Sequence, residues 1–135
     1  MADSSTTIDK LRDPDGSLDR RALLQILPYG EDFLFIDRVV RLGSEQVEAT
    51  YRIPESAPFV EAHFVGLPLM PGVLIGEGMA QAGTVMVRYN LEDHASKDLL
   101  AFQIDNARFL APAVPGDTLR FHVELTKMRP RAARM

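Results

Sequence analysis

Residues 72–89, GVLIGEGMAQAGTVMVRY, predict a helix whose side chains are apolar or small on almost every side. Pro71 precedes this stretch and suits the start of a helix, where a missing N–H is tolerated. A helix that is apolar all round is buried, so other elements must cover it. We therefore expect one buried helix at the centre of the fold.

The flanking segments predict a second, short helix and several strands. Residues 18–27 have the apolar spacing of an amphipathic helix, with Ser17 as its N-cap and Pro28 at its end. Four segments predict strands: 33–40, 47–53, 99–110 and 118–127. An antiparallel sheet that curls around the single helix would bury it. We therefore expect an α+β fold and not an alternating parallel one.

The composition limits the classes of protein. The chain has 135 residues, 46% apolar and 25% charged, which fits one globular domain. It has no cysteine, which excludes a disulfide framework, a thiolate metal site and a cysteine nucleophile. The formal charge of −4 argues against a dedicated nucleic-acid-binding protein. The last ten residues carry only positive charges, and we favour a solvated basic tail over a contact for an anionic partner.

Neither a leader nor a membrane span is expected. The first 16 residues are polar and acidic and have no apolar core of a signal peptide. Residues 64–87 contain a single ionisable group, Glu77, but prolines and glycines interrupt them, and a central carboxylate is costly in a membrane. We therefore expect a cytoplasmic protein.

Glu77 is the most informative residue, because it is the only charge between Glu61 and Arg88 apart from a possible charge on His63. Carboxylates are rarely buried unless they are paired or functional. Burial raises the pKa of a carboxyl group, which makes it a competent general acid near neutral pH. The alternative is that Glu77 marks the point where the helix meets water.

His63 lies in the long irregular segment that precedes this helix. A lone histidine in an apolar loop is often only a packed, hydrogen-bonded side chain. Together, however, a neutral imidazole and a protonated carboxyl group make a base–acid pair. We therefore take His63 and Glu77 as the candidate catalytic pair.

The start of the helix could bind an oxyanion. The first amides, those of Gly72 and Val73, have no partner within the helix and lie at its positive end. Gly76, Gly78 and Gly83 each cost about 1 kcal/mol relative to alanine inside a helix, which indicates close approach of a backbone or ligand. Tight helix–sheet packing explains these glycines equally well.

The other histidines are weaker candidates. His94 is expected in an exposed polar loop, and His122 lies in the last expected strand. Their spacing matches no metal-binding pattern, and the chain has no nucleotide-binding glycine motif and no nucleophile elbow. We therefore expect neither a metal nor a cofactor.

Residues 63–81, HFVGLPLMPGVLIGEGMAQ, resemble the signature HFPGxPxMPGVLxxExxAQ of the (3R)-hydroxyacyl-acyl-carrier-protein dehydratases of type II fatty acid synthesis. Leu27-Pro28 with FLFIDRV at residues 33–39 resembles the opening motif of the same family. DNARF at residues 105–109 and VPGD at residues 114–117 resemble its later strand and turn. The resemblance covers about residues 20–127.

The resemblance implies the hot-dog fold, a long helix wrapped by an antiparallel sheet, in dimers with two sites at the interface. His63 of one chain would remove the α-proton of a β-hydroxyacyl thioester, and Glu77 of the other would protonate the leaving hydroxyl group. The amide of Gly72 or of its neighbour Val73 would polarise the thioester carbonyl, and Gln81 would support the site from behind. The implied partner is an acyl carrier protein that bears a phosphopantetheine-linked acyl chain. The related dehydratase–isomerases carry Asp at the position of Glu77, so the non-isomerising enzymes are more similar.

The chain departs from this family at several positions. Val65 replaces the proline of HFPG, and Tyr29-Gly30 replaces a basic pair. Ala111 stands where a basic residue is usual, which leaves Arg108 as the candidate for carrier-protein docking. The end, RPRAARM, does not read as a strand, so we expect the sheet to lack its final strands or to be completed by a partner.

We expect the chain to consist of a disordered arm (residues 1–16), a dehydratase-like hot-dog domain (17–127) and a basic tail (128–135). Two alternatives to a dehydratase remain. In a hot-dog thioesterase, Glu77 would activate water to hydrolyse the thioester. A non-catalytic relative would bind an acyl carrier or complete a hetero-oligomer.

Overall fold

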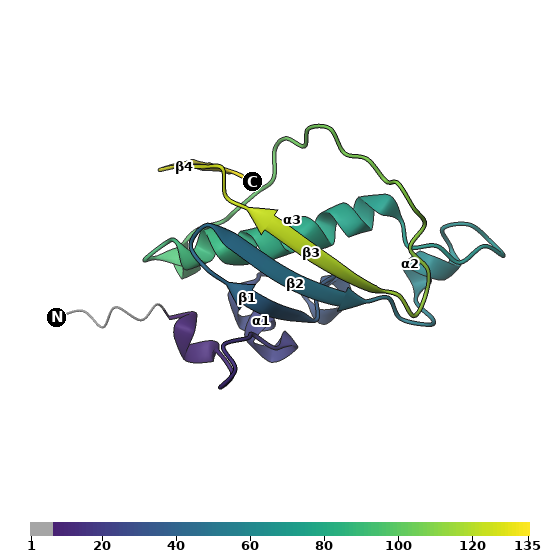
Figure 1. Cartoon of the computed structure of the whole chain (residues 1–135), viewed down its shortest axis with the longest axis horizontal. Coiled ribbons are helices and arrows are strands. Elements are labelled where there is room, and N and C mark those ends of the chain that lie inside the picture. Colours follow the sequence, from purple (N-terminus) through teal and green to yellow (C-terminus); the bar gives the residue numbers. More distant parts are fainter. Residues whose placement is uncertain (1–6) are drawn as a thin grey trace.

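A central helix, α3 (Gly72–Tyr89), lies across one face of an antiparallel sheet (Figure 1). The structure is a computed structural model that describes residues 7–135. The helix has the bounds expected from the sequence. A shorter helix, α1 (Arg20–Ile26), contacts α3 from outside the sheet. This arrangement confirms the expected α+β fold.

The sheet contains β1 (Arg38–Leu42), β2 (Gln46–Arg52) and β3 (Thr118–Glu124), paired in the order β1–β2–β3. Burial alternates along β2 and β3, because successive side chains point to opposite faces of a sheet. The inward side chains pack against α3 and form the core; they include Val47, Ala49, Tyr51, Phe121 and Val123. These strands confirm the expectations for residues 47–53 and 118–127 to within a few residues.

The expected strand at residues 33–40 begins later than predicted. Glu31–Phe33 forms a 3-10 helix, and β1 starts only at Arg38. The buried Gln81 side chain takes the place of a neighbouring strand here, because it accepts the Phe35 N–H and donates to the Phe33 carbonyl. A side chain of α3 therefore binds backbone that the sequence assigned to the sheet.

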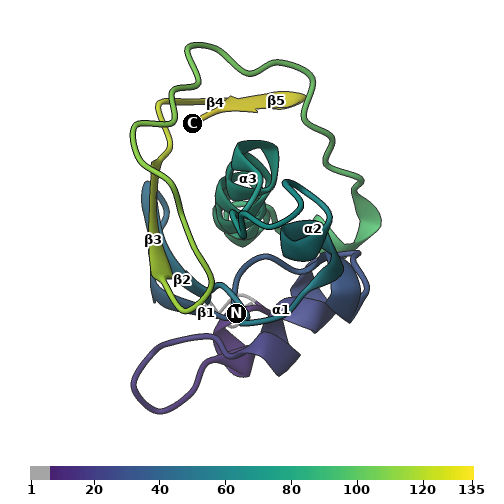
Figure 2. The same cartoon turned by 90° about the vertical axis from the view of Figure 1, so that its right-hand side faces the viewer.

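Residues 99–110, also expected to be a strand, are not one in the described chain. They follow a 3-10 turn (His94–Ser96) and arch away from the body as an extended, exposed segment (Figure 2). Leu100, Phe102 and Ile104 are 75–86% exposed. A strand needs a partner edge, and no described strand of this chain pairs with the segment.

The N-terminal region also differs from the expectation. The first six residues of the expected arm lie outside the described part. Beyond them Ile8 is fully buried, and Asp9–Leu11 forms a 3-10 helix. Asp19, and not Ser17, caps α1, since its side chain accepts the Ala22 N–H.

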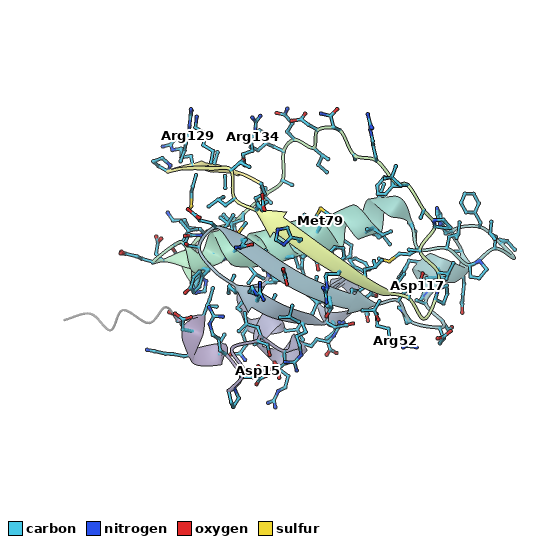
Figure 3. All side chains as sticks on the ribbon, viewed as in Figure 1. Asp15, Arg52, Met79, Asp117, Arg129 and Arg134 are labelled. Atoms are coloured by element: carbon cyan, nitrogen blue, oxygen red, sulfur yellow. The ribbon has the colours of Figure 1, made fainter. Side chains whose placement is uncertain are left out.

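The C-terminal residues form a small hairpin of β4 (Lys127–Arg129) and β5 (Ala132–Arg134), although their sequence did not predict a strand. Figure 2 shows this hairpin beyond the end of the main sheet, facing α3. The Met135 side chain reaches Gly83 on that helix. Arg129 and Arg134 lie near each other and project outwards (Figure 3). Because Gly83 has no side chain, it leaves room on α3 for the side chain of Met135, which is far away in the sequence.

Candidate active site

His63 lies just after the short helix α2 (Pro58–Glu61), in the irregular connection to α3. Its ring packs against Phe64, with ring centroids 4.4 Å apart, and its side chain is otherwise exposed. Its Nδ1 lies 3.2 Å from the Leu69 carbonyl oxygen. Gly66, Pro68 and Pro71 interrupt regular structure in this connection, which ends at the start of α3.

The contact with Leu69 sets the tautomer of His63. A carbonyl oxygen can only accept, so Nδ1 must carry the proton and donate it. In the neutral form of the ring, the other nitrogen, Nε2, then holds the lone pair and can accept a proton from a substrate. The contact with the Leu69 carbonyl therefore orients the His63 ring so that Nε2 can act as a base.

The cavity beside His63 has a volume of about 340 Å³ and lies at the start of α3. Gly72, Ile75 and Phe109 line it together with His63. The first N–H groups of a helix lack partners within the helix, and the positive end of its dipole lies there. The structure thus brings the predicted base and the predicted oxyanion site at Gly72 into one cavity, while Val73, also predicted, is 77% exposed.

Glu77 is half-buried on α3, one turn before Gln81. The Gln81 amide donates to Glu77 Oε1 at 3.1 Å and to the Phe33 carbonyl at 2.8 Å. Its carbonyl oxygen accepts from the Phe35 N–H at 2.9 Å. Gln81 therefore holds one carboxylate oxygen of Glu77 in place through this hydrogen bond.

Within one chain, Glu77 and His63 do not share a cavity. Glu77 is not among the residues that line the cavity of His63. Two residues turn a helix by about 200°, so Glu77 faces nearly away from Ile75, which does line that cavity. The two candidate catalytic side chains are thus separated in the single chain.

Tyr29 is a neighbour of Glu77 that sequence reasoning missed as part of the site. Burial raises the pKa of Tyr29, and the charge of Glu77 raises it further. Its ring packs edge-on against Phe33, with centroids 5.7 Å apart. A neutral phenol therefore stands near Glu77, at the position where the resembling family has a basic pair.

The remaining candidates lie outside the site. His94 is buried, contrary to the expectation of an exposed loop, and burial followed by the charge of Arg88 lowers its pKa. His122 is on the outer face of the sheet, with Nε2 3.2 Å from Glu124 Oε1. Arg108 is exposed, next to Phe109 of the cavity.

Within residues 7–135, no helix is both long and apolar enough to cross a membrane.

The chain is similar in sequence to known proteins. The family described as FabA-like domain matches residues 27–135. The curated 3-hydroxyacyl-[acyl-carrier-protein] dehydratase FabZ of Solibacter usitatus is 37% identical over 118 residues, which cover 87% of this chain and 73% of the relative. The protein of the same name from Desulforamulus reducens is 42% identical over 113 residues, covering 83% of this chain and 79% of the relative.

Among solved structures, the chain is similar to the dehydratase heterocomplex ApeI:P from Xenorhabdus doucetiae. The TM-score is 0.61 at 16% sequence identity, over 80% of this chain and 73% of the other. At this identity the likeness concerns the fold alone. With the central helix and the antiparallel sheet, it confirms the expected hot-dog fold.

Proposed function

Because the chain belongs to the FabA-like domain family, we propose that it dehydrates a (3R)-3-hydroxyacyl thioester on acyl carrier protein to the trans-2-enoyl thioester. Relatives at 37–42% identity carry the name of that dehydratase. The observation that carries the proposal is the cavity that His63 lines together with Gly72, the first residue of α3. The reaction belongs to fatty acid biosynthesis and takes place in the cytoplasm.

In the proposed reaction, His63 Nε2 takes the α-proton of the substrate. The electron pair of the broken Cα–H bond forms the new Cα–Cβ double bond as the Cβ–O bond breaks. The carboxyl group of Glu77 donates its proton to the departing hydroxyl group, which leaves as water. An amide at Gly72 or Val73 stabilises the charge that develops on the thioester oxygen. Return of the proton from His63 to Glu77, directly or through water, restores the pair.

The separation of the two side chains within one chain implies a shared site in a homodimer. His63 of one copy acts with Glu77 of the second, and each dimer carries two such sites. The acyl carrier protein delivers the substrate, and Arg108, exposed beside the cavity, is the candidate contact for it. Neither nucleic acid nor a membrane takes part.

Mixing two inactive variants tests both the reaction and the shared site. We expect His63→Ala and Glu77→Gln each to abolish the enoyl absorbance that wild type produces from a β-hydroxybutyryl thioester. In a mixture of the two after subunit exchange, about half of the dimers are mixed and each has one intact site, so about a quarter of the wild-type turnover returns.

The outcomes separate the parts of the proposal. Turnover by either variant alone would contradict the assigned role of that residue. A mixture that stays inactive, although subunit exchange is verified by mass, would place both groups of a site in one chain. Release of free thiol without enoyl product would identify a thioesterase instead.

A further inference from the structure

Phe109 rests on the first residue of α3. A Cβ atom added to Gly72 would lie 3.0 Å from Cδ1 and Cε1 of the Phe109 ring and 3.1 Å from Cδ2. A point at nearly equal distances from three ring atoms lies close to the axis through the ring centre, so the face of the ring, and not its edge, is turned to Gly72. A side chain at position 72 would require the ring to move away by a few tenths of an ångström.

The position of this ring is not explained by the hydrophobic core. Phe109 is 58% exposed, and the flanking residues Arg108 and Leu110 are exposed as well. The segment is tied to the body just beyond Phe109, where the Met70 N–H donates to the Ala113 carbonyl at 2.9 Å. The ring is therefore held against the helix start on a segment that otherwise faces solvent.

Phe109 and His63 line the same cavity. An apolar ring at this position limits the water that reaches the start of α3, and hydrogen bonds and dipoles act more strongly where water is excluded. A flat ring also limits the orientations that a planar thioester can take between the helix start and His63. Both effects act at the reacting end of a substrate, which acyl thioesters of every chain length share.

We propose that Phe109 is a substrate-positioning residue that holds the thioester against the start of α3, within reach of His63. This inference rests on the proposed function and adds a residue to it. It implies that the role of Phe109 does not depend on acyl chain length.

The test compares Phe109→Ala and Phe109→Tyr with wild type, using β-hydroxybutyryl and β-hydroxydecanoyl thioesters. We expect Phe109→Ala to lower kcat/KM by about tenfold or more for both chain lengths alike. Phe109→Tyr keeps the ring and restores most of the activity. The melting temperature and the sedimentation of Phe109→Ala are measured alongside, so that a loss of stability or of the dimer is distinguished from a loss of positioning. Val40→Ala, at an exposed position of β1, is the control for loss of an apolar side chain.

A second measurement does not depend on turnover. Calorimetry with saturated butyryl-pantetheine, which has no hydroxyl group to eliminate, reports only binding. We expect weaker binding to Phe109→Ala than to wild type or Val40→Ala. If wild type binds this thioester but dehydrates nothing, the proposed function fails, and the affinities still decide the role of Phe109.

Three results would overturn the role of Phe109. One is wild-type kcat/KM together with wild-type affinity in Phe109→Ala. Another is a loss that grows with chain length, which would place the ring along the acyl chain. The last comes from Gly72→Ala, whose methyl group would push the ring away. Its effect should be large in wild type and small in the Phe109→Ala background, so equal effects would show that the ring–glycine contact is irrelevant.

Discussion

The side chain of Gln81 joins the candidate acid Glu77 to the backbone that leads into β1. It is fully buried, and its amide group makes three hydrogen bonds, to Glu77, Phe33 and Phe35. A buried amide group with every partner in place holds its neighbours in one arrangement. Gln81 therefore couples the geometry of Glu77 to the stability of the fold.

We predict that Gln81→Leu lowers the free energy of unfolding by about 1–3 kcal/mol, because it leaves the buried N–H of Phe35 without its partner and removes the hydrogen bond to the carbonyl of Phe33. Dehydration should fall as well, since Glu77 loses the group that orients it. Urea denaturation measures the first effect. Gln25→Leu is the matched control, because Gln25 is exposed on α1 and should change stability little. Equal stability of the two variants would contradict the role given to Gln81.

At the scale of elements, the glycines of α3 serve different purposes. A Cβ at Gly78 would lie 2.8 Å from both the ring of Phe121 and the carbonyl oxygen of Phe35. That glycine lets the sheet and the segment before β1 approach the helix closely. A Cβ at Gly76 would meet no described atom from outside its own helix within 4 Å. Close approach within the chain therefore explains Gly78 but not Gly76.

The turn before β3 contains a glycine that the backbone requires. Gly116 has φ +90°, its N–H donates to the Ile53 carbonyl at 2.9 Å, and the Ile53 N–H donates to the Asp117 carbonyl at the same distance. These bonds align β3 with the end of β2. The residue thus sets where the pairing of the two strands begins.

We predict that alanine at Gly116 and alanine at Gly76 change the free energy of unfolding in opposite directions. Gly116→Ala should lower the free energy of unfolding by about 1–2 kcal/mol, because a side chain is strained at positive φ. Gly76→Ala should raise it by about 1 kcal/mol through helix propensity. Thermal unfolding of both variants alongside wild type checks the signs. A destabilised Gly76→Ala variant would show that another surface covers this position.

At the scale of the whole molecule, the exposed segment at residues 99–110 indicates contact with a second copy of the chain. Leu100, Phe102 and Ile104 alternate with more polar residues, as in a strand with one apolar face, yet they are exposed in the single chain. Exposed apolar surface of this kind marks an interaction site. Pairing of this segment between two copies would form the strand that the sequence predicts, in the dimer in which we propose that His63 of one chain acts with Glu77 of the other.

We predict that the wild-type chain sediments as a dimer at micromolar concentration. Phe102→Asp should shift it towards monomer and lower turnover in parallel, because an unpaired charge would be buried at the interface. Met128→Asp, at a partly exposed apolar position of β4, is the control and should leave the dimer intact. A dimer that survives Phe102→Asp with full activity would place the interface elsewhere.

The sequence alone determined the features that depend on near neighbours. The limits of α3 could be predicted because a helix makes its hydrogen bonds within four residues, so composition and a preceding proline suffice. The alternation along β2 and β3 was likewise visible. His63 and Glu77 stood out by residue type, because charged groups in an apolar stretch need a reason to be there.

Only the tertiary structure decided features that join distant residues. It bound the segment before β1 to Gln81, buried His94, and left residues 99–110 without the partner that a strand requires. It also placed Phe109 on Gly72 and separated His63 from Glu77 within one chain. These contacts depend on how elements meet in space, and local propensities carry no information about which distant surface a residue will face.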